Sequence, residues 1–399
     1  MSVSESERIL RLAARGDGVG ESGRFFPMTA PGDLVAPDGS LTPGAHRTLP
    51  PCRHFPDCGG CQLQHVDDAA YGVFLRDRIA SALAAQQMPL PDILAPHISP
   101  PNSRRRSSLR AERKGRHFAL GFNAEASHRV IDMRECHILR PELFALVDPL
   151  RELMGTLLGP RGGGGVRLTL ADQGPDVLLE KVAADGLEAA EALTRFAEAH
   201  RIARLAVDDG YGAQTRWEPE LVTATLGGVA VALPPIAFLQ ATQEGEAALV
   251  AAVRAALGPA RRVGDLFAGL GTFALALDCR ILAVEGERDA CIALGSAAKS
   301  AGRPIFVEHR DLFRRPLMAA ELDKLDAVVL DPPRAGAREQ IEQIAASRVE
   351  RIAYVSCNPS TFARDAATLI EGGYRLLWIQ PVGQFRWSVH VELAAAFSR

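Results

Sequence analysis

One segment of the sequence, residues 263–275, constrains the fold more than any other. It reads VGDLFAGLGTFAL: a short apolar run ending in an acid, then Gly269 and Gly271, then alanine and leucine at helical spacing. This order predicts a strand, a tight turn and a helix. Such a unit opens a doubly wound α/β domain, in which ligands lie at the carboxyl ends of the strands.

Two kinds of nucleotide-like ligand fit this turn. The glycines let a ligand approach the backbone closely, and Glu285, which closes the next apolar run, is placed to accept a hydrogen bond from a ribose hydroxyl. The spacing Gly269-x-Gly271-x-x-Ala274 fits the dinucleotide fingerprint. The same layout serves S-adenosylmethionine (SAM), which has no phosphates. A turn that merely packs a helix on a sheet is the third alternative, so the glycines alone do not decide.

The strand pattern around this segment favours SAM. Six further apolar runs follow the strand at 263–266, each bounded by loop or helix signals: residues 281–284, 305–307, 327–330, 352–355, 376–379 and 389–395. Seven strands that end in an adjacent pair match the sheet of a SAM-dependent methyltransferase better than that of a dinucleotide dehydrogenase. We therefore predict a Rossmann-like class I SAM methyltransferase domain of the α/β class over residues 233–399.

The rest of the chain divides into two regions. A chain of 399 residues is long enough for two or three domains. Residues 51–232 mix helical and strand patterns and predict a central α+β RNA-binding domain, with helices near 71–87 and 142–158. Residues 1–50 resemble the first half of a TRAM domain, a small OB-like barrel that binds RNA. A proline-rich link over 37–51 stands in place of the second half, so we expect a truncated barrel or a plain N-terminal arm.

Composition and cysteine content indicate a reducing compartment. The chain is 47% hydrophobic and 23% charged, as in a soluble globular protein, and no run approaches eighteen apolar residues. The start, MSVSESER, lacks the form of a signal peptide, so we expect a cytoplasmic protein with no membrane partner. The seven cysteines are then better explained as metal ligands, a nucleophile or core residues than as disulfide partners.

Four cysteines predict a metal centre ahead of the α/β domain. Cys52, Cys58 and Cys61 lie within ten residues, and the last two flank a Gly-Gly turn that lets both sulfurs face one centre. Cys136 is the best fourth ligand because the other three cysteines fall inside the α/β domain. Four thiolates accept zinc or a [4Fe-4S] cluster, and the spacing does not separate the two.

A run of cations lies in the central region. Seven arginines or lysines and one acid, Glu112, occur in the thirteen residues from Arg104 to Arg116 of a chain whose net charge is −3. Alternation at 108–113 and an apolar run at 118–122 predict two antiparallel strands with a basic face. We favour contact with nucleic-acid phosphates over a merely solvated face.

Three reactive side chains fall at strand ends of the α/β domain. Asp331 follows the fourth strand, Cys357 follows the fifth, and Glu392 sits at the start of the last. In a methyltransferase sheet the last strand runs antiparallel beside the fifth, so Glu392 should lie close to Cys357. Pro359 suits the first residue of a helix, and a cysteine just before a helix N-terminus is favoured as a thiolate. We therefore expect Cys357 to be a nucleophile rather than a small core residue.

Together these motifs resemble the RNA uracil-C5-methyltransferase family, in its iron–sulfur branch that acts on 23S rRNA. The resemblance covers nearly the whole chain from Cys52 onward. It rests on Cys-x5-Cys-x2-Cys, FLQ ending at Gln240, DLFAGLG, DPPR, SCNP and the final Glu392. Thr272, Thr242 and Asp311 stand where this family often has asparagine.

The resemblance implies a role for each of these positions. Cys357 would be the nucleophile and Glu392 the base, and the four cysteines of the predicted metal centre would hold a [4Fe-4S] cluster. Five residues would line the SAM pocket: Gln240, Phe267, Glu285, Asp311 and Asp331. The partner would be a single-stranded or loop uridine of 23S rRNA, and the enzyme would act as a monomer.

The reaction explains why a thiol and a carboxylate are needed. Carbon 5 of uracil is too weak a nucleophile to take a methyl group from a sulfonium unaided, so the Cys357 thiolate adds to carbon 6 and makes an enolate that attacks the methyl group. Carbon 5 then carries both methyl and hydrogen, and Glu392 removes that proton so that the thiolate can leave. The target base has to be splayed out of its stack to reach the pocket.

Three other functions stay open at this point. The first is the same chemistry on a tRNA uridine. The second is a non-catalytic RNA-binding factor for ribosome assembly with a vestigial SAM fold, which the intact Cys357 and Glu392 disfavour. The third is an NAD-type dehydrogenase.

Overall fold

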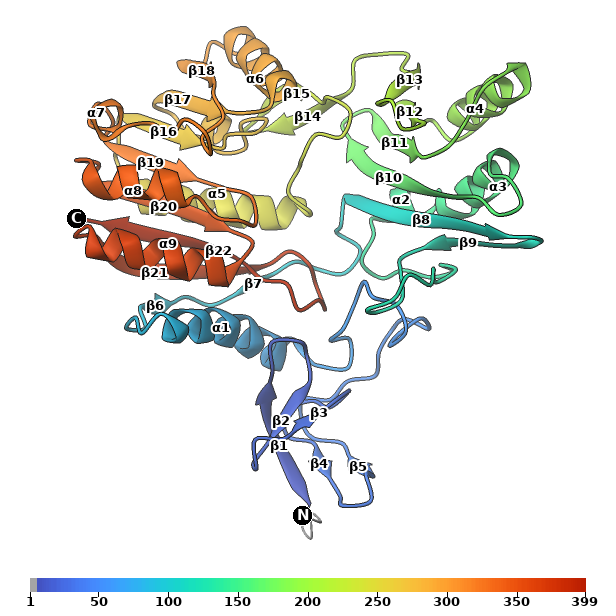
Figure 1. Ribbon diagram of the computed structural model, residues 1–399, viewed down its shortest axis with the longest axis horizontal. Coiled ribbons are helices and arrows are strands. Elements are labelled where there is room, and N and C mark those ends of the chain that lie inside the picture. The colour runs from blue at the N-terminus through green and yellow to red at the C-terminus, as the bar shows by residue number, and fades with distance from the viewer. Residues whose placement is uncertain (1–5) are drawn as a thin grey trace.

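The computed structural model describes residues 6–399 and shows three packed regions (Figure 1). The C-terminal sheet with its helices fills the left of the view, the central sheet lies at the upper right, and a small N-terminal sheet projects below. In this described part of the chain no helix is long and apolar enough to cross a membrane.

The C-terminal region is a doubly wound sheet that contains the seven predicted strands. They are β16 (Arg262–Leu266), β17 (Arg280–Glu285), β18 (Ile305–His309), β19 (Ala327–Leu330), β20 (Arg351–Ser356), β21 (Arg375–Gly383) and β22 (Glu392–Ser398). Their order is β18-β17-β16-β19-β20-β22-β21. The first five are parallel, and β22 is antiparallel to both of its neighbours, β20 and β21. The predicted fold class of this region is confirmed.

Helices cover both faces of this sheet and complete two apolar cores. On one face lie α5 (Gln243–Leu257) and α6 (Arg288–Ser300), and on the other α7 (Ala319–Leu322), α8 (Arg338–Ala346) and α9 (Pro359–Glu371). Thr242 caps α5 by accepting the Gly245 amide at 3.0 Å, and Asn358 caps α9. Pro359 is the first residue of α9, as predicted.

The glycine turn after β16 leads into a single 3₁₀ turn, Ala274–Ala276, so the prediction of a helix there was wrong. The hairpin of β14 (Thr223–Leu226) and β15 (Val229–Ala232) lies against this segment. A Cβ atom added at Gly227 would lie 2.4 Å from the Leu275 carbonyl oxygen. The hairpin therefore occupies the space that a helix would need, and the chain turns directly into β17.

Part of the predicted central region belongs to the C-terminal sheet instead. Helix α1 (Asp68–Ala85) packs in the same core as α8 and α9, and β6 (Asp92–Ile93) and β7 (His97–Ile98) pair in parallel with β21. The apolar face of α1, with Phe74 and Leu75 almost fully buried, explains this position. The C-terminal sheet is thereby extended by residues from early in the chain.

The central region is an α+β domain built on a six-stranded sheet. Its elements are β8 (Arg106–Lys114), β9 (His117–Gly121), α2 (Pro141–Phe144), α3 (Val147–Leu157), β10 (Gly163–Ala171), β11 (Gly174–Glu180), α4 (Leu187–Ala199), β12 (Arg204–Asp208) and β13 (Gln214–Trp217). The sheet order is β13-β12-β11-β10-β8-β9. The expected antiparallel pair β8–β9 is present, and the helix expected near 142–158 is divided into α2 and α3.

Two segments that run side by side connect the central and C-terminal domains. One leads from β7 to β8 and the other from β15 to α5. They are joined by a hydrogen bond from the Arg105 amide to the Ala241 carbonyl at 2.9 Å and by one between the Ser99 and Thr242 hydroxyls at 2.8 Å. The Arg105 guanidinium also pairs with Glu246.

The N-terminal region is a sheet of five short strands. These are β1 (Glu7–Leu12), β2 (Gly18–Gly20), β3 (Phe25–Phe26), β4 (Leu34–Val35) and β5 (Leu41–Thr42), in the order β3-β2-β1-β4-β5. Within residues 6–399 the edge strands β3 and β5 do not pair with each other, so the sheet is open. This agrees with a partial barrel. Residues 1–5 of the predicted segment lie outside the described residues.

Helix α1 also holds the loop between β21 and β22. The fully buried Tyr71 hydroxyl lies 3.2 Å from the Phe385 carbonyl oxygen and 3.1 Å from that of Ser388. We predict that Tyr71→Phe lowers the free energy of unfolding by about 1 kcal/mol and speeds amide hydrogen exchange in residues 384–391. Denaturant unfolding and exchange mass spectrometry measure the two effects.

Tyr374→Phe is the matched control, because its buried hydroxyl donates to the Val349 carbonyl at 2.7 Å, away from this loop. It should cost similar stability and leave exchange in 384–391 unchanged. Equal exchange in both variants would show that Tyr71 does not hold the loop.

Candidate active site

The carboxyl ends of the strands bring the predicted catalytic side chains together. Asp331 directly follows β19, Cys357 directly follows β20, and Glu392 is the first residue of β22. Ser356 is paired with Leu393, so the next positions along the two antiparallel strands are those of Cys357 and Glu392. Cys357 and Glu392 therefore lie at neighbouring positions in the structure, as predicted from the sequence.

Cys357 and Glu392 line a cleft of about 680 Å³ between the C-terminal domain and the central sheet. Arg334 lines it from the C-terminal side, Arg106 and Ser107 of β8 line it from the central sheet, and Phe238 comes from the connecting segment. The Arg106 guanidinium lies 4.2 Å from the centre of the Phe238 ring. The buried Arg106 Nε and Ser107 Oγ have no hydrogen-bond partner within residues 6–399.

The acids of the site are buried enough to hold protons near neutral pH. Burial raises the pKa of Glu392 to about 8, with a further increase from Asp331, and burial raises the pKa of Asp331 to about 7. Burial also raises the pKa of the Cys357 thiol, and the nearby Glu392 and Asp331 add to this, whereas Arg334 lowers it. Glu392 and Cys357 both line the cleft, and such perturbed groups in one cleft are typical of a catalytic centre.

Two strand-end loops are tied to each other beside Cys357. Asn358 Nδ2 donates to the Arg334 carbonyl oxygen at 3.0 Å, and the Thr361 hydroxyl donates to the same oxygen at 3.2 Å. Asn358 Oδ1 accepts the Ser360 amide as the cap of α9. The DPPR and SCNP motifs therefore fix one another.

A glutamine that the sequence reasoning missed connects the acids. Gln384 is buried and donates from Nε2 to Glu392 and, at 2.8 Å, to Gln240 Oε1. Gln240 in turn donates from Nε2 to Asp331 at 3.3 Å. Gln240 and Asp331, both predicted to line the SAM pocket, are thus linked to the predicted base. The only sequence signal for Gln384 was its position eight residues before Glu392, between two adjacent strands.

The other predicted SAM-pocket residues gather at the ends of β16, β17 and β18. Glu285 accepts the Gly269 amide at 2.7 Å and the Glu287 amide at 2.7 Å. Phe267 has a φ of 65°, and its ring centre lies 5.4 Å from that of Phe313, another residue the sequence reasoning missed. Asp311 accepts the Phe313 amide at 3.0 Å. This group lies at the same edge of the sheet as Asp331, where a doubly wound fold binds its ligand.

The four predicted metal-ligating cysteines line one small cavity, together with Phe122 and His54. All four are free thiols. Burial raises the pKa of Cys61 to about 12, and the neighbouring Cys136, Cys58 and Cys52 contribute to the increase. Across residues 6–399, however, no three or more His, Cys, Asp or Glu side chains are arranged to hold a single metal ion.

The arginines of the basic run lie in two kinds of position. Arg104 and Arg106 line the cleft, and Arg104 lies 5.3 Å from the centre of the Phe385 ring. Arg105 instead is buried against Glu246, and Arg113 donates to the Gly155 and Leu158 carbonyls at 2.6 and 2.9 Å. The guanidinium groups of Arg105 and Arg113 are therefore structural, and neither is counted as a phosphate contact.

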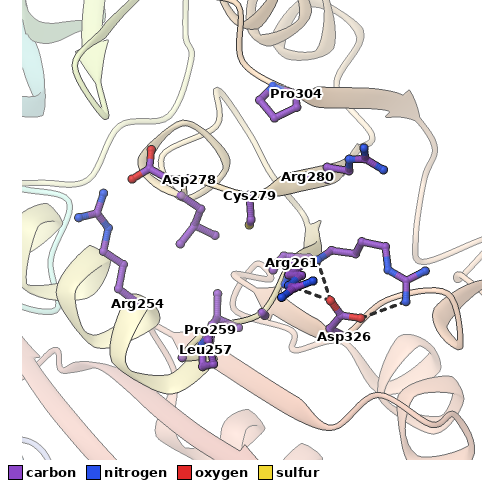
Figure 2. A pocket seen from close by; sticks show the side chains of 14 residues that line it. Arg254, Leu257, Pro259, Arg261, Asp278, Cys279, Arg280, Pro304 and Asp326 are labelled. Carbon is purple, nitrogen blue, oxygen red and sulfur yellow. Dashed lines mark hydrogen bonds and ion pairs between the residues drawn. The ribbon is translucent and has the colours of Figure 1, made fainter.

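A larger hollow, of about 1060 Å³, lies at the opposite, amino-terminal edge of the sheet (Figure 2). Arginines surround it, among them Arg254, Arg261 and Arg280, and the Arg262 guanidinium pairs with Asp326 at 3.0 Å. None of the predicted site residues lies there. The cleft at the carboxyl ends is therefore the better candidate for the active site.

Comparisons with known proteins agree with this geometry. The sequence profile of the tRNA (Uracil-5-)-methyltransferases matches residues 305–399. An uncharacterized RNA methyltransferase of Zymomonas mobilis is 52% identical over 98% of this chain and 100% of its own length. The 23S rRNA (uracil(1939)-C(5))-methyltransferase RlmD of Chromohalobacter salexigens is 34% identical over 90% of this chain and 78% of its own length.

A solved structure shares the whole fold. The Pyrococcus abyssi tRNA (uracil-54, C5)-methyltransferase, in complex with S-adenosyl-L-homocysteine, matches with a TM-score of 0.75. The match covers 98% of this chain and 100% of that one, at 20% sequence identity. All three regions described above are therefore part of one known architecture.

The buried Asp265 at the base of the glycine turn predicts a pH-dependent stability. Burial raises its pKa to about 8, above the value of about 3.9 expected in the unfolded chain, so stability is lost as the pH rises between these values. Asp265→Asn removes this loss and keeps the acceptor for the Ala274 amide at 2.8 Å. We expect the variant to gain stability relative to the wild type between about pH 5 and pH 8 in denaturant unfolding.

Asp209→Asn is the control, because the exposed Asp209 also accepts one backbone amide, from Tyr211 at 3.2 Å. Its stability should follow that of the wild type at each pH. If the free energy of unfolding of Asp265→Asn changed with pH in parallel with that of the wild type, the prediction would be contradicted.

Proposed function

This chain belongs to the tRNA/rRNA uracil-5-methyltransferase family, and we propose that it transfers the methyl group of SAM to carbon 5 of a uridine in 23S rRNA. The observation that carries the proposal is the thiol of Cys357 beside the carboxyl of Glu392, at the strand ends and in one cleft. A nucleophile and a base are the two groups that this reaction requires.

The reaction begins at Cys357. Its thiolate adds to carbon 6 of the uracil and forms a carbon–sulfur bond, which makes carbon 5 an enolate carbon that attacks the methyl group. The position of Cys357 directly before α9 and beside Arg334 favours the thiolate against the effect of burial. Glu392 then accepts the proton of carbon 5, and the sulfur leaves carbon 6.

The SAM pocket extends along the carboxyl ends from β16 to β19. Glu285, fixed by two backbone amides, has lone pairs left to accept from ribose hydroxyls, and Phe267 and Phe313 offer apolar surface to the adenine. Asp311 lies next to Gly286 and completes this end. Asp331 and Gln240 are placed between this end and Cys357, suited to the methionine amine or to the uracil edge.

The substrate is proposed as rRNA because the relative named for 23S rRNA is 34% identical over most of both chains. Arg104 and Arg106 supply cations at the cleft, which suit the phosphates of a splayed-out nucleotide. A tRNA uridine is the second candidate, since the matching family profile and the solved structure carry that name. We propose that the enzyme acts as a monomer.

Cys52, Cys58, Cys61 and Cys136 are proposed to hold a [4Fe-4S] cluster. They surround one cavity, and four cysteine thiolates are the ligand set of such a cluster. When bound, such a cluster crosslinks its four ligands and can carry an electron.

The proposed function predicts methyl transfer that depends on Cys357. Unmodified 23S rRNA and tRNA transcripts are incubated with the protein and methyl-labelled SAM, and the digested RNA is separated into nucleosides. We expect 5-methyluridine in the rRNA only, and with Cys357→Ala a rate lower by at least about a thousandfold, because the nucleophile is lost.

Cys279→Ala is the control, since Cys279 is partly buried at the opposite edge of the sheet, and it should leave the rate unchanged. If 5-methyluridine formed in tRNA only, the substrate would be a tRNA uridine, the second candidate. No transfer to either RNA, or full activity of Cys357→Ala, would refute the proposed function.

The cluster predicts iron and inorganic sulfide in the protein. Purified without oxygen, the chain should carry roughly four of each. Cys61→Ser should lose both, because Cys61 is the most buried of the four thiols, and Cys279→Ser should retain them. Metal analysis that finds zinc and no sulfide would exclude the cluster.

A further inference from the structure

Gln384 has both ends of its side-chain amide engaged in the interior of the site. It is 1% exposed and lies just beyond the end of β21, while Glu392 begins β22. Its Oε1 accepts the Ala241 amide at 2.7 Å, and its Nε2 donates to Glu392 and to Gln240.

The Ala241 amide fixes the orientation of this side chain. A backbone N–H can only donate, so the atom facing it has to be the oxygen of Gln384, and the NH₂ group necessarily faces Glu392. Gln240 is oriented in the same way, since its Oε1 accepts from Gln384 and its Nε2 therefore faces Asp331. The two amides form a chain of fixed polarity that ends on a carboxyl group at each side.

A carboxyl oxygen that accepts from an NH₂ group is one that carries no proton. Gln384 thus reserves Glu392 Oε2 as an acceptor and leaves Oε1 as the atom that can take up a proton. The amide has no charge, so it stabilises the carboxylate without an ion pair in the cleft.

Of the other charged groups around Glu392, some favour its carboxylate form and some favour its protonated form. Asp331 at the end of β19 and the Cys357 thiolate at the end of β20 disfavour the carboxylate. Arg106 of β8 favours it, and Arg334 and His390 line the same cleft. Burial is the largest influence and favours the protonated form, so a neutral donor at hydrogen-bond distance shifts the balance toward the base.

We propose that Gln384 is the positioning residue that favours the proton-accepting form of Glu392 against burial and aims Oε1 at carbon 5 of the methylated base. The inference rests on the proposed function. In the step it serves, the carbon 5–hydrogen bond breaks and the proton goes to Oε1. The freed electron pair forms the carbon 5–carbon 6 double bond, and the sulfur of Cys357 leaves carbon 6 as a thiolate.

Gln384 packs closely against the first turn of α5. A Cβ atom added at Gly245, in the first turn of α5, would lie 2.7 Å from the Cβ of Gln384. The glycine therefore makes room for the glutamine. Gly245→Ala therefore crowds Gln384, and also the Thr242 hydroxyl at 2.7 Å, without changing any ionisable group.

The test compares Gln384→Met with the wild type in two measurements. The rate of 5-methyluridine formation is followed against pH, and RNA bound covalently to denatured protein is measured with methyl-labelled SAM. We expect the apparent pKa of the rising limb to increase by about one unit, so that the rate near neutral pH falls about tenfold and recovers in alkali. We also expect a labelled protein–RNA adduct to accumulate, because its formation precedes proton removal.

Gln340→Met is the matched control. Gln340 is also 1% exposed and makes two backbone hydrogen bonds, both with Leu317 on the far side of the domain, at 2.8 and 3.1 Å. It should lose comparable stability and keep the wild-type pH profile without adduct. If Gln384→Met does not fold, Gly245→Ala is measured instead, with the same changes expected.

The outcomes separate this inference from the proposed function. Suppose the wild type is active and the pH–rate profile of Gln384→Met, scaled for the fraction of folded protein, matches that of the wild type. This result would overturn the role of Gln384 and leave the proposed function standing. A shifted pH–rate profile without accumulation of the protein–RNA adduct would also overturn it. The substitution would then affect the addition of Cys357 and not the later removal of the proton. A wild type that forms no 5-methyluridine in any RNA would overturn the proposed function itself.

Discussion

The hydrogen bonding of β22 to both β20 and β21 is the constraint on which the site depends. In an otherwise parallel sheet, this antiparallel strand starts at the edge where its neighbour β20 ends. Glu392 therefore meets Cys357 through backbone pairing, and neither side chain has to be held by a flexible loop. A one-residue slip of β22 would turn Glu392 to the other face of the sheet, so the register itself protects the site.

The cysteine-rich segment reaches this site through the loop before β22. The amides of Gln62 and Leu63 both donate to the Trp387 carbonyl at 2.8 Å, and Trp387 packs with Cys61 and Ile138. Trp387 has a φ of 60°, a conformation that a bulky residue keeps only when its surroundings hold it. The conformation of the Gln384 loop thus depends on how the residues around the four thiols are packed.

Sequence patterns predicted what depends on local order, and missed what depends on distant partners. Strand order and the meeting of Cys357 with Glu392 follow from apolar runs and one known topology. The helix expected after Gly271 failed because a hairpin from residues 223–232 occupies its place, and no pattern in 263–275 reports that contact. Arg105 likewise reads as one more surface cation until its partner Glu246, 141 residues later, is known.

The paired connection through Ser99–Thr242 and Arg105–Ala241 has a consequence for how the chain is put together. The central domain is an insertion: the polypeptide completes the edge of the catalytic sheet, departs, and returns beside its own point of departure. Because Arg106 and Ser107 of this insertion line the cleft opposite Cys357 and Glu392, the bonds at the neck join the two walls of the candidate site.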